Sequence, residues 1–509
     1  IGFWLCGTVK TSTLIRGQTQ RLGSYLGETL TLSNRLTLDF SVRLNRVSGG
    51  FSAASKATSG NPLAYFVGEA VIKPFTKSAY PDVFPDGLNP WGVLTFSDRG
   101  DFLSWLSLTP RLGVVVNLWE EGKTLLKGSW ALYHDDLTPR SLLPLHPLYP
   151  GFIPLFWLDA NGNGRPDLED EFLPQSFDFR SLSNNYMEKR IADDLSSPQF
   201  SEISLGAEHH FNPNLSLTLK FISREEKNIL ADVPYDLAKD KAWYRSDEAD
   251  SSKYWLPFTT TIPATENFPA QTITFFVRSN QIPVFRQWRN VPELKRKYQA
   301  FEFNLDKKMS GGWGLSTTLI LSRSEGNIWG QSGSMGGSKE LIEANYFINR
   351  EGRLDTDRPI VFKLAGALEL PLSFNLGFFY QYQSGRLWTR RVSILPPADW
   401  CYQKGGERVY YELLLESAGT HREKAFSFLD LRLEKKMRLG PGSELWLYLD
   451  ALNLLGQKRE MRGLNDVDIW EPVAEGANKS GKLYYSPDYQ LTRELLGKRV
   501  FRLTLKLAF

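Results

Sequence analysis

The stretch that decides the fold is KRVFRLTLKLAF, residues 498–509, at the end of the printed sequence. Apolar and polar side chains alternate along it. The apolar parity holds Phe501, Leu503, Leu505, Leu507 and Phe509, and the other parity holds Arg502, Thr504 and Lys506. A period of two indicates an extended strand with one apolar and one polar face, because an α-helix would mix the two sets. The stretch therefore predicts an amphipathic β-strand.

Two kinds of protein contain such strands. In a soluble β-sandwich the apolar face lies in the core, whereas in a membrane barrel it faces lipid. The length of this strand is near the roughly 9 to 11 residues that cross a bilayer when tilted. The choice depends on whether the same pattern recurs upstream.

The pattern recurs along most of the chain and predicts roughly fourteen strands, with the first one poorly patterned. The expected strands are residues 1–10, 23–32, 36–44, 112–118, 124–133, 203–207, 215–221, 301–305, 315–321, 360–370, 374–383, 426–437, 445–455 and 498–509. Residues 1–509 are thus expected to form one barrel segment.

Short turns and long loops alternate between these strands. The short turns are Ser33-Asn34, 120–123, 212–214, 310–312, 371–373 and 440–442, and the long loops are 47–101, 135–197, 225–297, 325–356, 386–424 and 456–497. An array of sandwich domains would instead show turns of even length about every 8 to 12 residues. The predicted fold class is therefore all-β, a transmembrane antiparallel up-and-down β-barrel with short periplasmic turns and long extracellular loops.

The positions of the charges agree with this fold. Ten charged residues fall on the polar parity of their strands: Asp39, Arg43, Glu208, Lys220, Glu302, Asp306, Asp430, Arg432, Arg502 and Lys506. A charge on the lipid face at the bilayer midplane costs about 2 to 4 kcal/mol, and a charge facing a watery lumen costs little. We therefore expect the apolar parity to contact outer-membrane lipid.

The totals exclude other classes. The chain has 60 basic and 57 acidic residues among 509, so a nucleic-acid partner is not expected. It lacks the roughly 18-residue apolar run of a spanning helix. Its two cysteines, Cys6 and Cys401, are too few for a disulfide framework.

Four stretches together resemble the barrel of TonB-dependent outer-membrane receptors, particularly the Oar-like branch. They are residues 108–133 (LTPRLGVVVNLWEEGKTLLKGSWALY), 292–330 (PELKRKYQAFEFNLDKKMSGGWGLSTTLILSRSEGNIWG), 357–385, and 429–455 (LDLRLEKKMRLGPGSELWLYLDALNLL). The resemblance implies about 22 strands, a plug inside the barrel, and a preceding segment that contacts TonB. Fewer strands and no plug-like segment are visible here, so we expect either the C-terminal part of a longer receptor, which the start at Ile1 favours, or a smaller barrel without an energised gate.

The function that the resemblance implies is uptake of a scarce ligand across the bacterial outer membrane. Extracellular loops would capture an unidentified ligand, and the TonB complex would act through a plug segment absent from this chain. No enzymatic activity is expected. Two alternatives remain: a structural or adhesive outer-membrane protein with ligand-binding loops, and a passive porin.

One motif resembles a metal-binding loop, DANGNGRPDLED, residues 159–170. It matches the acidic calcium-loop template, with glycine at loop position 6. The predicted ligands are Asp159, Asn161, Asn163, Arg165 (through its backbone carbonyl), Asp167 and Asp170. Asp170 replaces the usual glutamate, Pro166 stiffens the loop, and no flanking helices are evident. We therefore expect either a structural Ca²⁺ site or a self-solvated Asn-Gly turn.

Other candidates have simpler explanations. Gly122-Lys123-Thr124 resembles the end of a phosphate-binding loop, but it lies in a hairpin turn. The histidines are scattered: His134, His146, His209, His210 and His421. Aromatic residues occur in the loops beside Asp247, Glu248 and Asp250: Trp91, Trp105, Trp243, Tyr244, Trp255, Trp288, Trp388 and Trp400. We expect most of these to belong to an interfacial girdle or to loop packing, with ligand contact as the alternative.

Overall fold

The computed structural model describes most of the chain. The described residues are 4–10, 16–57, 93–96, 99–119, 122–142, 152–158, 189–236, 238–264, 269–282, 285–328, 342–457, 459–462, 467–472, 482–484, 492–496 and 498–509.

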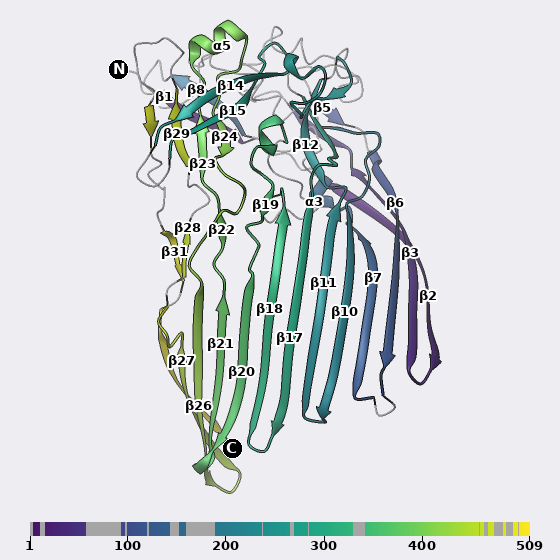
Figure 1. The fold of residues 1–509 in the computed structure, drawn as a ribbon, viewed down its shortest axis with the longest axis vertical. Coiled ribbons are helices and arrows are strands. Elements are labelled where there is room, and N and C mark those ends of the chain that lie inside the picture. Colours follow the sequence, from purple (N-terminus) through teal and green to yellow (C-terminus); the bar gives the residue numbers. More distant parts are fainter. Residues whose placement is uncertain are drawn as a thin grey trace.

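One large antiparallel sheet dominates the molecule (Figure 1). Each of its long strands pairs with the next one along the chain. Their order is β2 (Gly17–Ser33), β3 (Leu36–Phe51), β6 (Arg99–Asn117), β7 (Thr124–His134), β10 (Gln199–Asn212), β11 (Leu215–Lys227), β17 (Arg296–Ser310), β18 (Trp313–Gly326), β20 (Ile360–Leu370), β21 (Phe374–Gln383), β26 (Phe426–Gly440), β27 (Ser443–Leu452) and β32 (Val500–Ala508). The short β19 (Gly352–Arg353) also pairs with β18. This is the up-and-down order that the sequence predicts.

The predicted strands were too short at their outer ends. β3 continues to Phe51 and β6 begins at Arg99, so the part of the chain predicted as loop 47–101 contributes to both strands. Residue 105, predicted to lie in a loop, is a buried tryptophan within β6. The first predicted strand, β1 (Trp4–Lys10), pairs with β8 (Phe152–Leu158) and with no strand of the large sheet. Assigning it to the barrel wall was therefore wrong for the described residues.

The short turns lie where they were expected, except that residues 120 and 121 of the turn 120–123 lie outside the described residues. Gly311 and Gly312 connect β17 to β18 with φ angles of 62° and 82°. Two successive residues in the left-handed region match a two-residue hairpin turn, whose twist suits the flanking strands. Pro371–Ser373 forms the 3₁₀ turn η7 between β20 and β21. The C-terminus and these hairpin turns lie at the same edge of the molecule, the lower one in Figure 1.

The apolar parity is exposed on one face of the sheet. Leu219 on β11 lies opposite Phe303 on β17, and both keep more than a third of their surface accessible, 38% and 39%. Leu505 on β32 is 65% exposed. In a sandwich these side chains would pack against a second sheet. The sandwich alternative is therefore wrong, and the face is suited to lipid.

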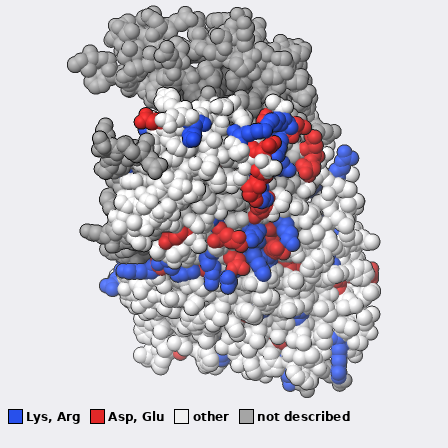
Figure 2. Space-filling view, turned by 45° about the horizontal axis from the view of Figure 1, so that its top comes forward, with Lys and Arg blue, Asp and Glu red and all other residues white. Residues whose placement is uncertain are grey.

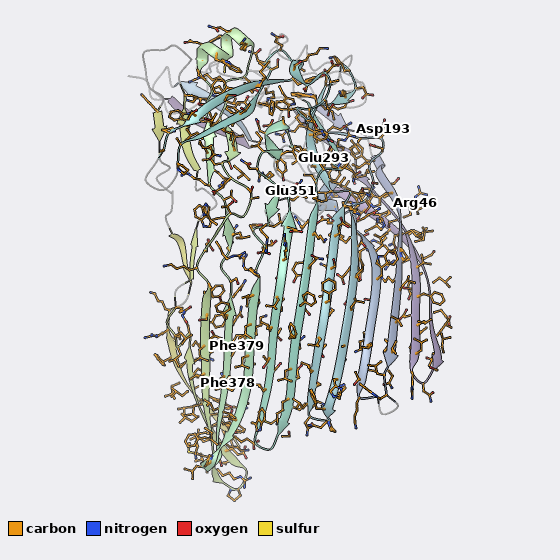
Figure 3. The ribbon with its side chains drawn as sticks, viewed as in Figure 1. Arg46, Asp193, Glu293, Glu351, Phe378 and Phe379 are labelled. Atoms are coloured by element: carbon orange, nitrogen blue, oxygen red, sulfur yellow. The ribbon has the colours of Figure 1, made fainter. Side chains whose placement is uncertain are left out.

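The opposite face carries the polar parity. Lys220 of β11 lies directly opposite Glu302 of β17 in the strand register. Figure 3 labels Phe378 and Phe379, neighbours on β21 whose side chains leave opposite faces because strand side chains alternate. In Figure 2, most visible charged side chains gather in a band between a largely uncharged lower part and the upper part of the molecule. The largely uncharged lower surface is suited to contact with lipid, and the band of charge lies above it.

The connections at the other end contain a second layer of structure, which we call the cap (Figure 1). All six long loops of the prediction contain strands among the described residues, so predicting them as loops throughout was wrong. The shorter strands in the connections are β4 (Ala54–Ala57), β5 (Val93–Phe96), β9 (Lys189–Ile191), β12 (Leu230–Asp236), β13 (Lys241–Ala242), β14 (Trp255–Ile262), β15 (Gln271–Arg278), β16 (Phe285–Asn290), β22 (Leu387–Trp388), β23 (Arg391–Ile394), β24 (Tyr411–Leu414), β25 (His421–Arg422), β28 (Arg459–Arg462), β29 (Val467–Glu471), β30 (Lys482–Tyr484) and β31 (Thr492–Leu496).

Helices are few and short in the described part of the chain. They are α3 (Pro139–Leu142), α5 (Ala398–Lys404) and the 3₁₀ turns η5 (Ser251–Lys253), η6 (Ala344–Phe347) and η7. A helix with the length and apolarity to cross a membrane is not found among the described residues.

The assignment of the two faces predicts unequal responses to the same substitution. Leu219→Arg places a charge on the apolar face of β11 and should cost about 2 to 4 kcal/mol of unfolding free energy, whereas Thr218→Arg on the polar face should cost much less. Urea unfolding of the chain folded into phospholipid vesicles measures both. Equal losses for the two variants would contradict the assignment of faces.

Candidate functional site

The candidate site is the cap together with the polar face of the large sheet, since these are the surfaces that a solute would meet. Three connections that are far apart in sequence build the centre of the cap. The hairpin β14–β15 packs against β23 and β24 and against Trp470 of β29. Their shared core holds Phe258, Ile262, Ile273, Phe275, Val277, Val392, Ile394, Tyr411, Leu413, Leu415 and Trp470. The connections therefore form one packed unit.

A buried hydrogen bond fixes the third connection to the first. The indole Nε1 of Trp470 donates to Oγ1 of Thr260 at 3.0 Å. Trp470 is 8% exposed, so most of its surface lies in the shared core. Burying a large aromatic side chain with its N–H satisfied stabilises such a contact through both area and hydrogen bonding.

Charged side chains join β15 and other elements of the cap. Arg278 at the end of β15 donates from Nε to Glu407 at 2.5 Å, and its Nη1 lies 4.0 Å from Glu343. Arg286 of β16 lies 3.8 Å from Asp232 of β12. Burial raises the pKa of Glu343, and the nearby Arg278 offsets part of this effect. Removing one partner of such a buried network leaves a charge without compensation.

A second group of charged side chains links the end of β18 nearest the cap to neighbouring connections. The side chain of Asp357 is fully buried and accepts from Arg353 at 2.9 Å, from Arg422 at 2.7 Å and from the backbone N–H of Ser324 at 2.7 Å. Arg386 lies 3.4 Å from the adjacent Asp355. Four donors and two acids thus hold the rim of the sheet in a defined arrangement.

Most of the tryptophans predicted as ligand or girdle candidates pack inside the cap. Trp243 stacks on Tyr254 at 4.7 Å between ring centroids and contacts Trp255 at 5.0 Å. Trp288 lies in a separate buried cluster with Leu230. Burial raises the pKa of Tyr244 and of Tyr254 to about 12. Loop packing is therefore the role of these residues, which was one of the two expectations.

Other predicted candidates are separated from one another. His209 contacts Thr124 at 2.6 Å, and His210 contacts Glu208 at 2.9 Å. His421 stacks on Trp388 at 4.4 Å. Of the acids near the aromatic residues, Asp247 pairs with Arg245 and Glu248 pairs with Lys241 at 2.9 Å. These contacts are local and bring no set of catalytic groups together.

The predicted calcium ligands Asp159, Asn161, Asn163, Arg165, Asp167 and Asp170 lie outside the described residues, as do Trp91 and His146. Among the described residues, no group of three or more His, Cys, Asp or Glu is arranged to hold a metal ion.

Sequence reasoning missed the cap, although two signals were present. The connections are rich in aromatic and β-branched residues, for example WLPFTTTI at 255–262 and QTITFFVR at 271–278. Both stretches alternate and therefore had strand character. Their packing partners are far away in the chain, so local pattern alone did not place them.

Comparison with known proteins identifies the fold. The family model described as "Outer membrane beta barrel domain" matches residues 6–383. A search of curated proteins found none that matches this sequence.

Similar solved structures include the closed form of the ferric-catecholate import receptor Fiu of E. coli, with 11% identity, a TM-score of 0.46, and coverage of 97% of this chain and 45% of that chain. The outer membrane transporter YddB of Escherichia coli shows 10% identity, a TM-score of 0.43, and coverage of 97% and 54%. The FrpB iron transporter of Neisseria meningitidis shows 11% identity, a TM-score of 0.42, and coverage of 97% of this chain and 46% of that chain. The chain spans about half the length of these proteins. At these TM-scores the likeness supports no functional argument.

The carboxyl of Glu343, whose side chain is mostly buried at 22% exposure, makes the stability of the cap depend on pH. Its pKa is raised in the folded cap, so its contribution is fully present below the ordinary carboxyl pKa and is lost as the pH rises toward the folded value. The neutral variant Glu343→Gln should therefore protect the amides of β14–β15 better than wild type does, and this difference should be larger at pH 8 than at pH 5. Hydrogen exchange, corrected for the intrinsic exchange rate at each pH, measures the protection.

The matched control is Glu412→Gln, which removes a half-exposed carboxyl of the same cap that pairs with Arg391. It should show no comparable gain at pH 8. A gain of the same size in the control would contradict the role of Glu343.

Proposed function

Because the chain belongs to the outer membrane beta barrel domain family, we propose that it forms the wall and extracellular cap of a TonB-dependent receptor that imports a scarce ligand. The protein lies in the bacterial outer membrane. The four stretches between residues 108 and 455 that resemble such receptors support this proposal, and they favour the Oar-like branch.

The observation that carries the proposal is the packed cap above a polar wall. Connections between β11 and β17, β21 and β26, and β27 and β32 share one hydrophobic core. Binding residues in barrels commonly lie on loops that a rigid scaffold positions. Buried aromatic and charged contacts hold the connections of the cap together as such a scaffold. The cap is therefore better suited to holding a ligand than to free diffusion.

In the proposed mechanism the cap captures the ligand from outside the cell. Its release into the lumen depends on TonB, which draws energy from the inner membrane and acts on a plug. The polar wall lines the path, and the apolar face keeps the sheet in lipid. This chain contributes the cap and the wall, and the activity that we assign to it is transport without covalent chemistry.

Comparison of three strains tests this function. The strains are wild type, one lacking this protein and one lacking TonB, each grown in a medium whose small molecules are measured over time. Both deletions should leave the same compound unconsumed, because uptake needs the receptor and its energy source. Restoring the gene should restore consumption in the first strain.

The alternatives give different results. For a passive porin, consumption would not depend on TonB, and the full-length protein in a planar bilayer would carry a steady ohmic current. For an adhesive protein, its deletion would reduce attachment to surfaces and leave consumption unchanged. Either result would contradict the receptor.

We also propose that residues 159–170 bind Ca²⁺ as a structural clamp on an extracellular connection. The support is the spacing of oxygen-bearing residues in the sequence, with Asp159, Asn161 and Asn163 at loop positions 1, 3 and 5.

Calcium titration of the purified chain tests the clamp. Asp159→Asn removes one charged ligand and should weaken Ca²⁺ binding by about tenfold, measured calorimetrically. Asp194→Asn removes an exposed acid outside the loop and should leave binding unchanged. Equal binding by wild type and Asp159→Asn would show that the loop is a self-solvated turn.

A further inference from the structure

The last three strands of the sheet carry an unusual group of charges on their polar face. Asp450 of β27 lies directly opposite Arg432 of β26 on one side and Arg502 of β32 on the other. Nε of Arg432 donates to Oδ1 of Asp450 at 2.6 Å, and its Nη2 donates to Oδ2 at 3.1 Å. Nε and Nη2 of Arg502 donate to Oδ2 at 2.9 and 2.7 Å. One carboxylate therefore holds two guanidinium groups.

This arrangement contains more positive charge than the carboxylate needs. One bidentate arginine is enough to satisfy a carboxylate. The side chain of Asp450 is 2% exposed, whereas those of Arg432 and Arg502 are 50% and 56% exposed. Within the described part of the chain, Nη1 of neither arginine has a hydrogen-bond partner. The group thus has one excess positive charge and presents N–H donors to the open side of the sheet.

A neighbouring aromatic residue contacts one arginine of the pair. The guanidinium carbon of Arg432 lies 5.3 Å from the ring centroid of Tyr448, a cation–π contact that limits its rotamers. A preorganised pair of donors loses less conformational entropy when it binds an anion. The geometry therefore resembles a binding site more than a flexible surface charge.

A second pair of cations lies on the same face, nearer the turn between β26 and β27. Lys436, Trp446 and Lys506 are opposite one another in the register, and the two ammonium groups lie 4.7 and 5.8 Å from the Trp446 ring. Lys436 also pairs with Glu444 at 2.8 Å. Glu434, which lies between the two pairs along β26, contacts the amide of Asn375 at 3.5 Å. On the polar face of β26, β27 and β32 the acids are Asp430, Glu434, Glu444 and Asp450, and the cations are Arg432, Lys436, Arg438, Arg502 and Lys506. The face therefore has one excess positive charge.

We propose that Arg432 and Arg502 form an oxyanion site on the inner wall of the barrel, which holds a carboxylate or phosphate group of a dissolved solute. Asp450 positions both guanidinium groups and neutralises only one of their two charges. The proposal rests on the proposed function, in which the polar face lines the path of the solute through the barrel, and it identifies an anionic solute as the chemical class that this wall attracts.

Binding of citrate to the purified chain in detergent tests the site by calorimetry at low ionic strength, with inorganic phosphate as a second probe. Wild type should bind citrate, and Arg502→Gln should weaken binding by about tenfold, because it removes one charged donor. Asp450→Asn keeps one side-chain oxygen that accepts from the guanidinium groups and removes the competing negative charge, so it should strengthen binding severalfold. Circular dichroism checks that each variant folds.

The matched control is Lys220→Gln, which removes a half-buried cation on the polar face of β11, away from β26, β27 and β32. It should leave citrate binding unchanged. Absence of binding to wild type, an equal loss in Lys220→Gln, or weaker binding in Asp450→Asn would each overturn the proposal. Because this assay needs neither TonB nor cells, its failure is distinct from a failure of the proposed uptake function.

Discussion

The structure depends on the requirement that every backbone N–H and C=O within a membrane finds a partner inside the protein. The ladder from β2 to β32 satisfies this requirement strand by strand, and each strand then has two faces by its own geometry. In register, Leu219 meets Phe303 and Lys220 meets Glu302, so neighbouring strands place like residues on the same side. A one-residue slip would turn the charges toward lipid. The sequence pattern and the backbone ladder therefore support the same register.

This constraint explains which parts of the fold were predictable. Within a strand the alternation is local, and turns such as Gly311-Gly312 are recognisable from their residue types. The hairpins could therefore be located from the sequence. The fold of the cap could not be predicted from local alternation or from turn residues. Thr260 and Trp470 are 210 positions apart, and several cap strands have only two to four residues. Contacts of that separation are set by packing, which a local pattern does not contain.

The candidate sites divide in the same way. The side of the sheet on which Arg432 and Arg502 lie was evident from their parity, because both fall between lipid-facing leucines and phenylalanines. Their meeting at Asp450 could not be predicted from parity. It requires that β26 pairs with β27 and that β27 pairs with β32, which follows it only after the 47-residue connection from 453 to 499. The tryptophans illustrate the opposite case. Trp243 and Trp255 lie beside acids in a stretch that was predicted as a loop, yet their environment is a packed core.

The direction of the strands adds a constraint on how the wall closes. The sheet has 14 strands, and without the side strand β19 there are thirteen on the path, so the antiparallel order makes β2 and β32 run the same way. No pairing joins these two edges among the described residues. Unpaired edges in lipid cost several kcal/mol per polar group. If β2 paired directly with β32, the two strands would be parallel. If a second copy of the chain were inserted in the same orientation, β32 of one copy would likewise run parallel to β2 of the other at each junction. Antiparallel closure of the wall therefore requires an odd number of strands in addition to those described, which gives the even total found in bacterial single-chain barrels.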